Sequence, residues 1–256
     1  MSSLEIHQFL CRSDNYGVLI HDNAKQVTAS IDAPDAQAVA ANLTEKGWQL
    51  SHILTTHHHA DHVGGNAQLK ADSGCLIIGP RDEADRIDTL DKTVAGGDRF
   101  TFGSFEVEVL DTPGHTSGHI SFYVPGAGVA FVGDTMFAMG CGRLFEGDAR
   151  TMWASLSRLM ALPDDTTIYC GHEYTLANAR FAAALDPTNE ALQQRLAEVV
   201  AMRERGALTL PTTIVLEKAT SPFVRAHDPA LREHLNMAEA EDWEVFAEVR
   251  KRKDNA

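Results

Sequence analysis

The chain has 256 residues, of which 44% are hydrophobic and 23% charged, so its composition is that of an ordinary globular protein. Its formal net charge of -14 argues against general binding to nucleic acid or to an anionic membrane, and an anionic substrate would need a local cationic patch. We find neither an export signal nor an apolar run of about eighteen residues, and therefore expect a cytoplasmic protein without a membrane span.

The first two thirds of the chain contain short apolar or β-branched runs bounded by turn residues, a pattern typical of strands. Strands are expected at residues 18–20, 27–31, 53–55, 75–78, 100–110 (as a hairpin), 119–124, 129–132 and 168–170. Apolar residues at helical spacing predict helices at 36–46, 66–72, 151–161, 176–185, 189–205, 229–235 and 241–251. This order predicts an α/β sandwich over residues 1–172 and a small helical domain over residues 173–256.

A dense group of histidines follows the strand expected at residues 53–55. The segment Thr56-His57-His58-His59-Ala60-Asp61-His62 has the pattern HxHxDH. So many imidazoles beside a carboxylate would be costly to bury without a metal ion to accept their lone pairs. Imidazole and carboxylate donors suit zinc, iron or manganese, so the segment predicts a metal site.

Three further metal-ligand candidates follow later predicted strands. They are His115 in a Pro-Gly-His turn, Asp134 after Val132-Gly133, and His172 after Cys170-Gly171. Each is a weak signal alone, but two metal ions at about four ligands each need more donors than HxHxDH supplies. The four scattered cysteines lack a CxxC pair, which predicts reduced structural thiols and not metal ligands.

The series HxHxDH…H…D…H resembles the metallo-β-lactamase superfamily at all seven positions. The resemblance implies an αββα sandwich that binds two divalent metal ions, with zinc favoured and iron or manganese compatible. It implies that His57, His59 and His115 hold one metal, that Asp61, His62 and His172 hold the other, and that Asp134 bridges both. Asp61 and Asp134, with a water that bridges the metals, are then the expected catalytic groups.

A closer resemblance, over nearly the whole chain, is to the glyoxalase II family of hydroxyacylglutathione hydrolases. Its motifs are matched at residues 14–16, 56–66, 133–137, 140–147, 170–175, 221–225 and 250–254. The resemblance implies that glutathione is bound by Arg143, Phe145, Tyr174, Arg250 and Lys253. Arg143 stands where some members have Lys, Phe145 where some have Tyr, and Ser221 where the family has Asn.

This family resemblance implies hydrolysis of S-(2-hydroxyacyl)glutathione, such as S-D-lactoylglutathione, to glutathione and D-lactate, the second step of methylglyoxal detoxification. A hydroxide held between the metals would attack the thioester carbonyl. The leaving thiolate, with a pKa near 8.5, needs little help from an acid. We expect a monomer with no nucleic-acid or membrane partner. His58 is expected to point away from the metals and His119 to orient a ligand.

Four other functions remain open from the sequence. A glutathione persulfide dioxygenase would use the same motif with a single iron, but the basic residues Arg250 and Lys253 argue against it. Those residues also argue against a lactonase or β-lactamase, unless they are merely a solvated helix end. A metallo-nuclease would need a basic face or an inserted domain, and a non-catalytic module would be expected to have lost some of the seven donors.

Overall fold

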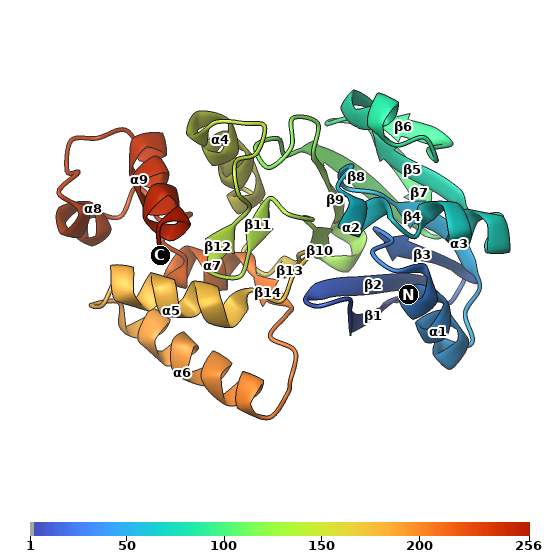
Figure 1. The fold of residues 1–256 in the computed structure, drawn as a ribbon, viewed down its shortest axis with the longest axis horizontal. Helices are drawn as coiled ribbons and strands as arrows, with labels where there is room; N and C mark the ends of the chain where they lie inside the picture. The colour runs from blue at the N-terminus through green and yellow to red at the C-terminus, as the bar shows by residue number, and fades with distance from the viewer. Residues whose placement is uncertain (1–2) are drawn as a thin grey trace. The chain divides into compact units, whose positions relative to one another are not determined.

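The computed structural model describes residues 3–256, which form two compact units (Figure 1). Unit 1 comprises the described residues up to Asp111 together with Ser117–Gly133, and unit 2 comprises Thr112–Thr116 and Asp134–Ala256. Within the described part of the chain, no helix has both the length and the apolar character that crossing a bilayer requires.

The first sheet of unit 1 has six strands in sequence order. They are β1 (Leu4–Cys11), β2 (Asn15–Asp22), β3 (Val27–Ile31), β4 (Leu50–Leu54), β5 (Leu76–Pro80) and β6 (Lys92–Val94). The first three strands pair antiparallel and the rest pair parallel. Because parallel neighbours need crossovers, helices α1 (Ala36–Lys46) and α3 (Asn66–Ser73) connect them and pack against the sheet (Figure 1).

Helix α1 shows how the sequence encodes the ends of such a crossover. The Asp35 side chain accepts a hydrogen bond from the Ala38 N–H at 2.8 Å, which caps the first turn. Gly47 ends the helix in the left-handed conformation at φ 69°, as its position in the sequence predicts. Between them, Val39 and Leu43 are buried in the core of unit 1.

The second sheet of unit 1 is an antiparallel meander. Its strands are β7 (Arg99–Phe102), β8 (Phe105–Asp111), β9 (Ile120–Val124) and β10 (Val129–Phe131). The turn between β7 and β8 meets the first sheet, because the Ser104 N–H donates to the Asp22 carboxylate at 2.6 Å. The rings of His52 on β4 and Phe102 on β7 meet edge to face at 5.5 Å. The two sheets of unit 1 therefore form a sandwich.

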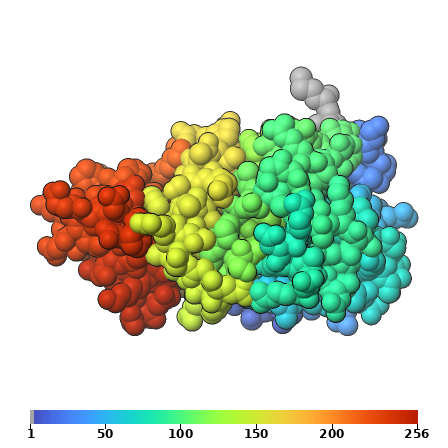
Figure 2. Space-filling model, turned by 90° about the horizontal axis from the view of Figure 1, so that it is seen from above, coloured from blue at the N-terminus to red at the C-terminus, as the bar shows by residue number. Residues whose placement is uncertain are grey.

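Unit 2 is mainly helical and carries short strands. Its elements are β11 (Met136–Phe137), β12 (Gly140–Cys141), α4 (Ala149–Met160), β13 (Thr167–Tyr169), α5 (Thr175–Leu185), α6 (Glu190–Glu204), β14 (Thr212–Thr213), α7 (Ile214–Thr220), α8 (Pro229–Leu235) and α9 (Asp242–Asp254). Helices α5 and α6 pack side by side, and α4 packs against α9. In the space-filling view the red helices α8 and α9 form one end of unit 2 (Figure 2).

The predicted helices and strands are present in the structure, which also contains elements that were not predicted. The sequence did not predict β1, β6, β11, β12, β14, α2 or α7. Helix α7 begins with Ile-Val-Leu, a run that favours a strand. Thr213 overrides that preference, because its side chain accepts from the Leu216 N–H and caps a helix.

Candidate metal centre

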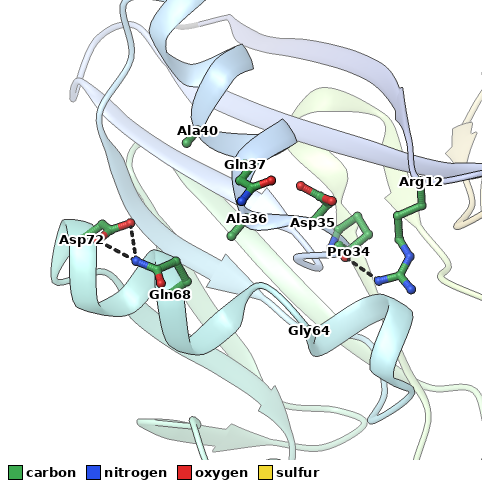
Figure 3. Close-up of a pocket in the computed structure, with 9 residues that line it drawn as sticks. All are labelled: Arg12, Pro34, Asp35, Ala36, Gln37, Ala40, Gly64, Gln68 and Asp72. Atoms are coloured by element: carbon green, nitrogen blue, oxygen red, sulfur yellow. Dashed lines mark hydrogen bonds between the residues drawn. The ribbon is translucent and has the colours of Figure 1, made fainter.

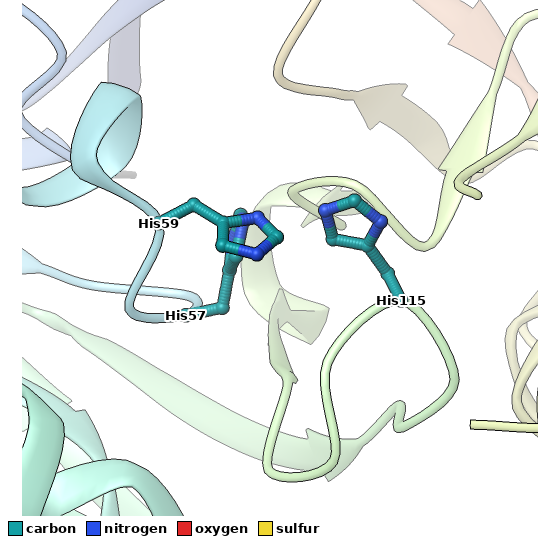
Figure 4. Close-up of side chains that lie close together, drawn as sticks. All are labelled: His57, His59 and His115. Atoms are coloured by element: carbon teal, nitrogen blue, oxygen red, sulfur yellow. The ribbon is translucent and has the colours of Figure 1, made fainter. Parts of the chain in front are cut away.

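The HxHxDH residues lie on the loop after β4 and on the short helix α2 (Ala60–Val63). His57 and His62 are buried, whereas His59 and Asp61 are half-buried. His57 Nε2 lies 3.1 Å from His59 Nδ1, and His62 Nε2 lies 3.8 Å from Asp61 Oδ2 (His57 and His59 in Figure 4). Unit 1 therefore brings all four of its predicted ligands into one cluster.

A carboxylate that the sequence analysis missed organises this cluster. Asp32, directly after β3, accepts hydrogen bonds from the Thr56 N–H at 2.7 Å and from the Thr56 hydroxyl at 2.9 Å. Its Oδ2 also accepts from His62 Nδ1 at 2.8 Å. Asp32 has φ 54°, so it holds this position in the left-handed region, which few non-glycine residues adopt. An acidic residue at a strand end was the only sequence signal for this role.

The hydrogen bonds to Asp32 determine which ring nitrogens carry lone pairs. Because a carboxylate only accepts, His62 Nδ1 carries a proton, and in the neutral ring the lone pair is then on Nε2. The Thr56 hydroxyl donates to Asp32, so its oxygen accepts from His57 Nδ1 at 3.0 Å. His57 Nε2 then also presents a lone pair. Metal-ligating histidines show this arrangement, with one ring N–H held by a protein acceptor.

Other polar contacts support the same loop. The Asn15 amide donates to the Asp61 carboxylate at 3.2 Å. His58, as expected, is engaged elsewhere, since its Nδ1 lies 2.7 Å from Glu83 Oε2. Glu83 also accepts from the His58 N–H and from the Gly118 N–H, at 2.7 and 3.1 Å. The ring of His119 stacks on that of His57 at 4.9 Å, consistent with an orienting role.

Unit 2 contains the other three predicted ligands and places two histidines beside one carboxylate. His115 Nε2 and His172 Nε2 lie 3.5 and 3.3 Å from Asp134 Oδ2, and all three residues are buried (His115 in Figure 4). His115 Nδ1 donates to the Arg143 carbonyl oxygen at 2.9 Å. A neutral His115 therefore turns the Nε2 lone pair toward a carboxylate. Either a proton or a cation must relieve that repulsion, so this donor set fits a divalent metal ion.

Glycines allow the backbone to approach these donors closely. A Cβ at Gly142 would lie 2.0 Å from the Asp134 carbonyl oxygen and 3.0 Å from His115 Nδ1. Gly114, with φ 139°, sets the turn that carries His115. The turn is also tied down by Ser155 of α4, whose hydroxyl donates to the Pro113 carbonyl at 2.7 Å.

Two aromatic side chains expected to bind substrate lie beside the ligands of unit 2. The ring of Tyr174 stacks on that of His172 at 4.7 Å and 3°. The ring of Phe145 lies 5.3 Å from that of His115, and 63% of this large apolar side chain is exposed. Both rings offer apolar surface next to metal-ligand candidates.

The three basic residues are near one another but differ in exposure. Burial lowers the pKa of Lys253, and the positive charges of Arg250 and then Arg143 lower that pKa further. Arg143 is exposed, whereas Arg250 is buried and donates to the Cys141 carbonyl oxygen at 3.0 Å and to Asp254 at 2.7 Å. Lys253 is half-buried, with Nζ 3.2 Å from the Ala177 carbonyl. Arg143 and Lys253 can meet a ligand directly, and Arg250 supports the loop.

The cysteines are free and buried. Burial raises the pKa of Cys141 to about 11 and also raises the pKa of Cys170. The free thiols agree with the expectation of reduced cysteines.

A separate polar groove in unit 1 contains none of the predicted site residues (Figure 3). Its volume is about 560 Å³, and Arg12, Asp35, Gln68 and Asp72 are among the residues that line it. Arg12 donates to the Pro34 carbonyl oxygen, and Gln68 donates to Asp72 across one helical turn. The polar side chains of Arg12 and Gln68 are thus hydrogen-bonded to other residues that line the groove.

Comparisons with known proteins bear on this arrangement. Residues 28–172 match the family model described as the metallo-beta-lactamase superfamily, and residues 173–256 match that of the hydroxyacylglutathione hydrolase C-terminus. The chain is 59% identical to the hydroxyacylglutathione hydrolase of Rhizobium meliloti (strain 1021) over 255 residues, which cover 100% of each chain. The chain belongs to the hydroxyacylglutathione hydrolase family. The family, the fold class and the glyoxalase II function expected from the sequence are thereby confirmed.

The fold of this hydroxyacylglutathione hydrolase family member is also similar to that of solved structures. ETHE1 from Myxococcus xanthus superposes with a TM-score of 0.70 at 27% identity, covering 96% of this chain and 90% of that one. TTHA1623 in a di-iron-bound form gives a TM-score of 0.59 at 25% identity, covering 84% and 97%. The roles of the individual ligands and the domain boundary after residue 172 stay predictions.

Proposed function

We propose that the protein hydrolyses the thioester of S-(2-hydroxyacyl)glutathione, such as S-D-lactoylglutathione, to glutathione and the 2-hydroxy acid. The observation that carries the proposal is Asp134, whose carboxylate lies within 3.5 Å of an imidazole nitrogen on both His115 and His172. A carboxylate between two imidazole donors is suited to bridging two cations, which is what a binuclear hydrolase needs.

Seven side chains would hold the metals. They are His57, His59 and His115 for one ion, Asp61, His62 and His172 for the other, and Asp134 for both. Two divalent cations at these donors, with zinc favoured and iron or manganese compatible, would lower the pKa of water and polarise the thioester carbonyl. We also propose that residues 1–172 form the catalytic domain and residues 173–256 the substrate-binding domain.

The surrounding residues keep the donors ready for cations. Asp32 accepts from His62 Nδ1 and, through the Thr56 hydroxyl, orients His57 Nδ1, so in each neutral ring the Nε2 lone pair would be available to a cation. The Asn15 amide donates to Asp61 and orients its carboxylate. The thiolate leaving group has a pKa near 8.5, so it needs little help from an acid side chain. No side-chain nucleophile is needed either, because metal ions would lower the pKa of the attacking water.

The glutathione end of the substrate carries two carboxylates and an ammonium group. Arg143 and Lys253 supply positive charge that the chain, at -14 overall, otherwise lacks. The rings of Phe145 and Tyr174 offer apolar contact beside His115 and His172. Arg250, the third basic residue proposed for glutathione, also holds the Cys141 carbonyl, two residues before Arg143.

Hydrolysis of S-D-lactoylglutathione by the metal-loaded protein, followed by loss of thioester absorbance, tests the proposal. We expect turnover to release glutathione and D-lactate in equal amounts without oxygen uptake. Oxygen uptake with glutathione persulfide, and no thioester hydrolysis by protein carrying two metal ions, would instead identify a dioxygenase and reject the proposal.

A further inference from the structure

The turn that joins β11 and β12 is held at three backbone positions by three different helices. Asn178 of α5 donates from Nδ2 to the Ala138 carbonyl oxygen at 3.2 Å. Glu217 of α7 accepts from the Met139 N–H at 2.8 Å, and Arg250 of α9 donates to the Cys141 carbonyl oxygen at 3.0 Å. All of these residues belong to unit 2.

The side chains that reach this turn are buried and are themselves fixed. Glu217 is fully buried, and only 5% of Asn178 is exposed. The second carboxylate oxygen of Glu217 accepts from Arg195 and from the Thr212 hydroxyl, each at 2.6 Å. Buried ion pairs add little stability compared with well-packed apolar residues of similar volume. Stability alone therefore does not account for a buried, fully bonded carboxylate at this turn.

The backbone of this turn is in an unfavourable conformation, which its hydrogen bonds to the helices stabilise. Met139 has φ 53°, in the left-handed region that is unfavourable for a non-glycine residue. The next residue, Gly140, lies so close to α5 that a Cβ there would be 2.3 Å from Asn178 Nδ2. A strained residue that is tied to a buried carboxylate indicates a segment whose position matters.

The position of this turn determines where two predicted substrate contacts lie. Cys141 ends the hairpin, and Arg143 and Phe145 follow it within a few residues. Arg143 also accepts the His115 hydrogen bond through its carbonyl oxygen, so the segment connects the donors of unit 2 with the exposed cation. A shift at residues 138–140 would move both.

We infer that Glu217 and Asn178 are positioning residues that set the substrate-binding segment 141–145 by fixing the β11–β12 turn. The inference rests on the proposed function, because that function assigns Arg143 and Phe145 to glutathione. Both side chains are buried, so their effect on the substrate would be indirect. They act through Met139 and Ala138, and affinity for the thiol carrier should depend on them more than the chemical step does.

Glu217→Gln gives the first test. Glutamine keeps the shape but has one accepting oxygen, so it cannot satisfy both Arg195 and the Met139 N–H. We expect KM for S-D-lactoylglutathione to rise about tenfold, as for a lost buried hydrogen bond, with kcat changed less than about twofold. Leu231→Ala, in the core at α8, is the control. It should lower the melting temperature and leave KM unchanged.

A double-mutant cycle tests Asn178 without relying on Glu217. Gly140→Ala should raise KM, because the new methyl group collides with the Asn178 amide. In the Asn178→Ala background the same change should have little further effect, since the colliding atoms are gone. Equal effects of Gly140→Ala in both backgrounds would overturn the role of Asn178.

Amide hydrogen exchange over residues 138–145 separates this inference from the proposed function, because it needs no substrate. Glu217→Gln should speed exchange in this segment, whereas Leu231→Ala should not. If the wild type hydrolyses no thioester but exchange responds in this way, the turn is positioned as inferred and the proposed function fails. If the wild type is active while Glu217→Gln changes neither KM nor exchange, the inference is wrong.

Discussion

The two halves of the donor set are built in different ways. In unit 1, His57, His59, Asp61 and His62 come from a single loop and the first turn of a helix. In unit 2, His115, Asp134 and His172 come from three segments far apart in the sequence. A local motif fixes its own spacing and needs neighbours only for orientation, which Asp32 supplies. A dispersed set exists only when the fold brings its segments together.

This difference has a consequence for substrate binding. The donors of unit 2 share their supports with the predicted glutathione contacts, since His115 is bonded to the Arg143 carbonyl and His172 carries the ring of Tyr174. The donors of unit 1 are supported by Asp32 and Asn15, neither of which belongs to that contact set. Substitutions around unit 1 should act on metal affinity, and those around unit 2 also on KM.

The largest effect should follow from removing the negative charge of Asp134. Asp134→Asn keeps the shape but removes the carboxylate beside His115 and His172. We expect kcat/KM to fall by more than about a hundredfold, beyond the usual effect of losing a residue that merely orients a ligand. Bound metal, measured by plasma mass spectrometry, should fall as well. Asp165→Asn, an exposed change in the same unit, is the control. Full activity and full metal content in Asp134→Asn would contradict the bridging role.

Asp32→Asn should act on unit 1 alone. Asparagine tolerates the left-handed backbone at this position, so the loop should keep its shape. The amide can no longer accept from both Thr56 and His62 as a carboxylate does, and metal affinity should fall about 10–100-fold. Competition with a chelator measures the loss. Asp35→Asn, which keeps the α1 cap, should bind metal like the wild type. A rise in KM at saturating metal would show that the two halves are not separable in this way.

Lys253→Ala tests the charge in unit 2 that lies outside the donor set. We expect KM for the glutathione thioester to rise several-fold while kcat and metal content stay unchanged, because an ion pair with a half-exposed lysine is worth about 1 kcal/mol or less. Lys251→Ala removes an exposed lysine from the same helix and is the matched control. Equal effects of the two substitutions would reduce the role of Lys253 to general electrostatics.

The smallest effect concerns pH. Burial, Arg250 and Arg143 lower the pKa of Lys253, so it loses its charge at a lower pH than an ordinary lysine, whose pKa is about 10.4. Binding of an anionic substrate should therefore weaken as the pH rises through that lowered value, and KM should climb before an ordinary lysine would titrate. Lys253→Arg keeps its charge throughout and should flatten the rise. The same alkaline rise in Lys253→Arg would assign it to another group.

Many elements were predictable because their signals are local. Asp35 and Gly47 mark both ends of α1, and the alternation around Gly103 marks the β7–β8 hairpin. Helix α7 was not predictable in this way, since Ile214 and Val215 favour a strand and only the Thr213 cap shows the helix. Strands β11 and β12 have two residues each, too few to show an alternation.

The sequence by itself determined the chemistry of this protein, because HxHxDH, the three later donors and the family motifs are readable as residue types at fixed spacings. Only the tertiary structure revealed the supports. Asp32 reaches Thr56 and His62 from the end of another strand, and Glu217 reaches Met139 from a distant helix. The physical reason is that a hydrogen bond to a buried group depends on the position of both partners in space, and a distant partner leaves no periodic pattern in the sequence.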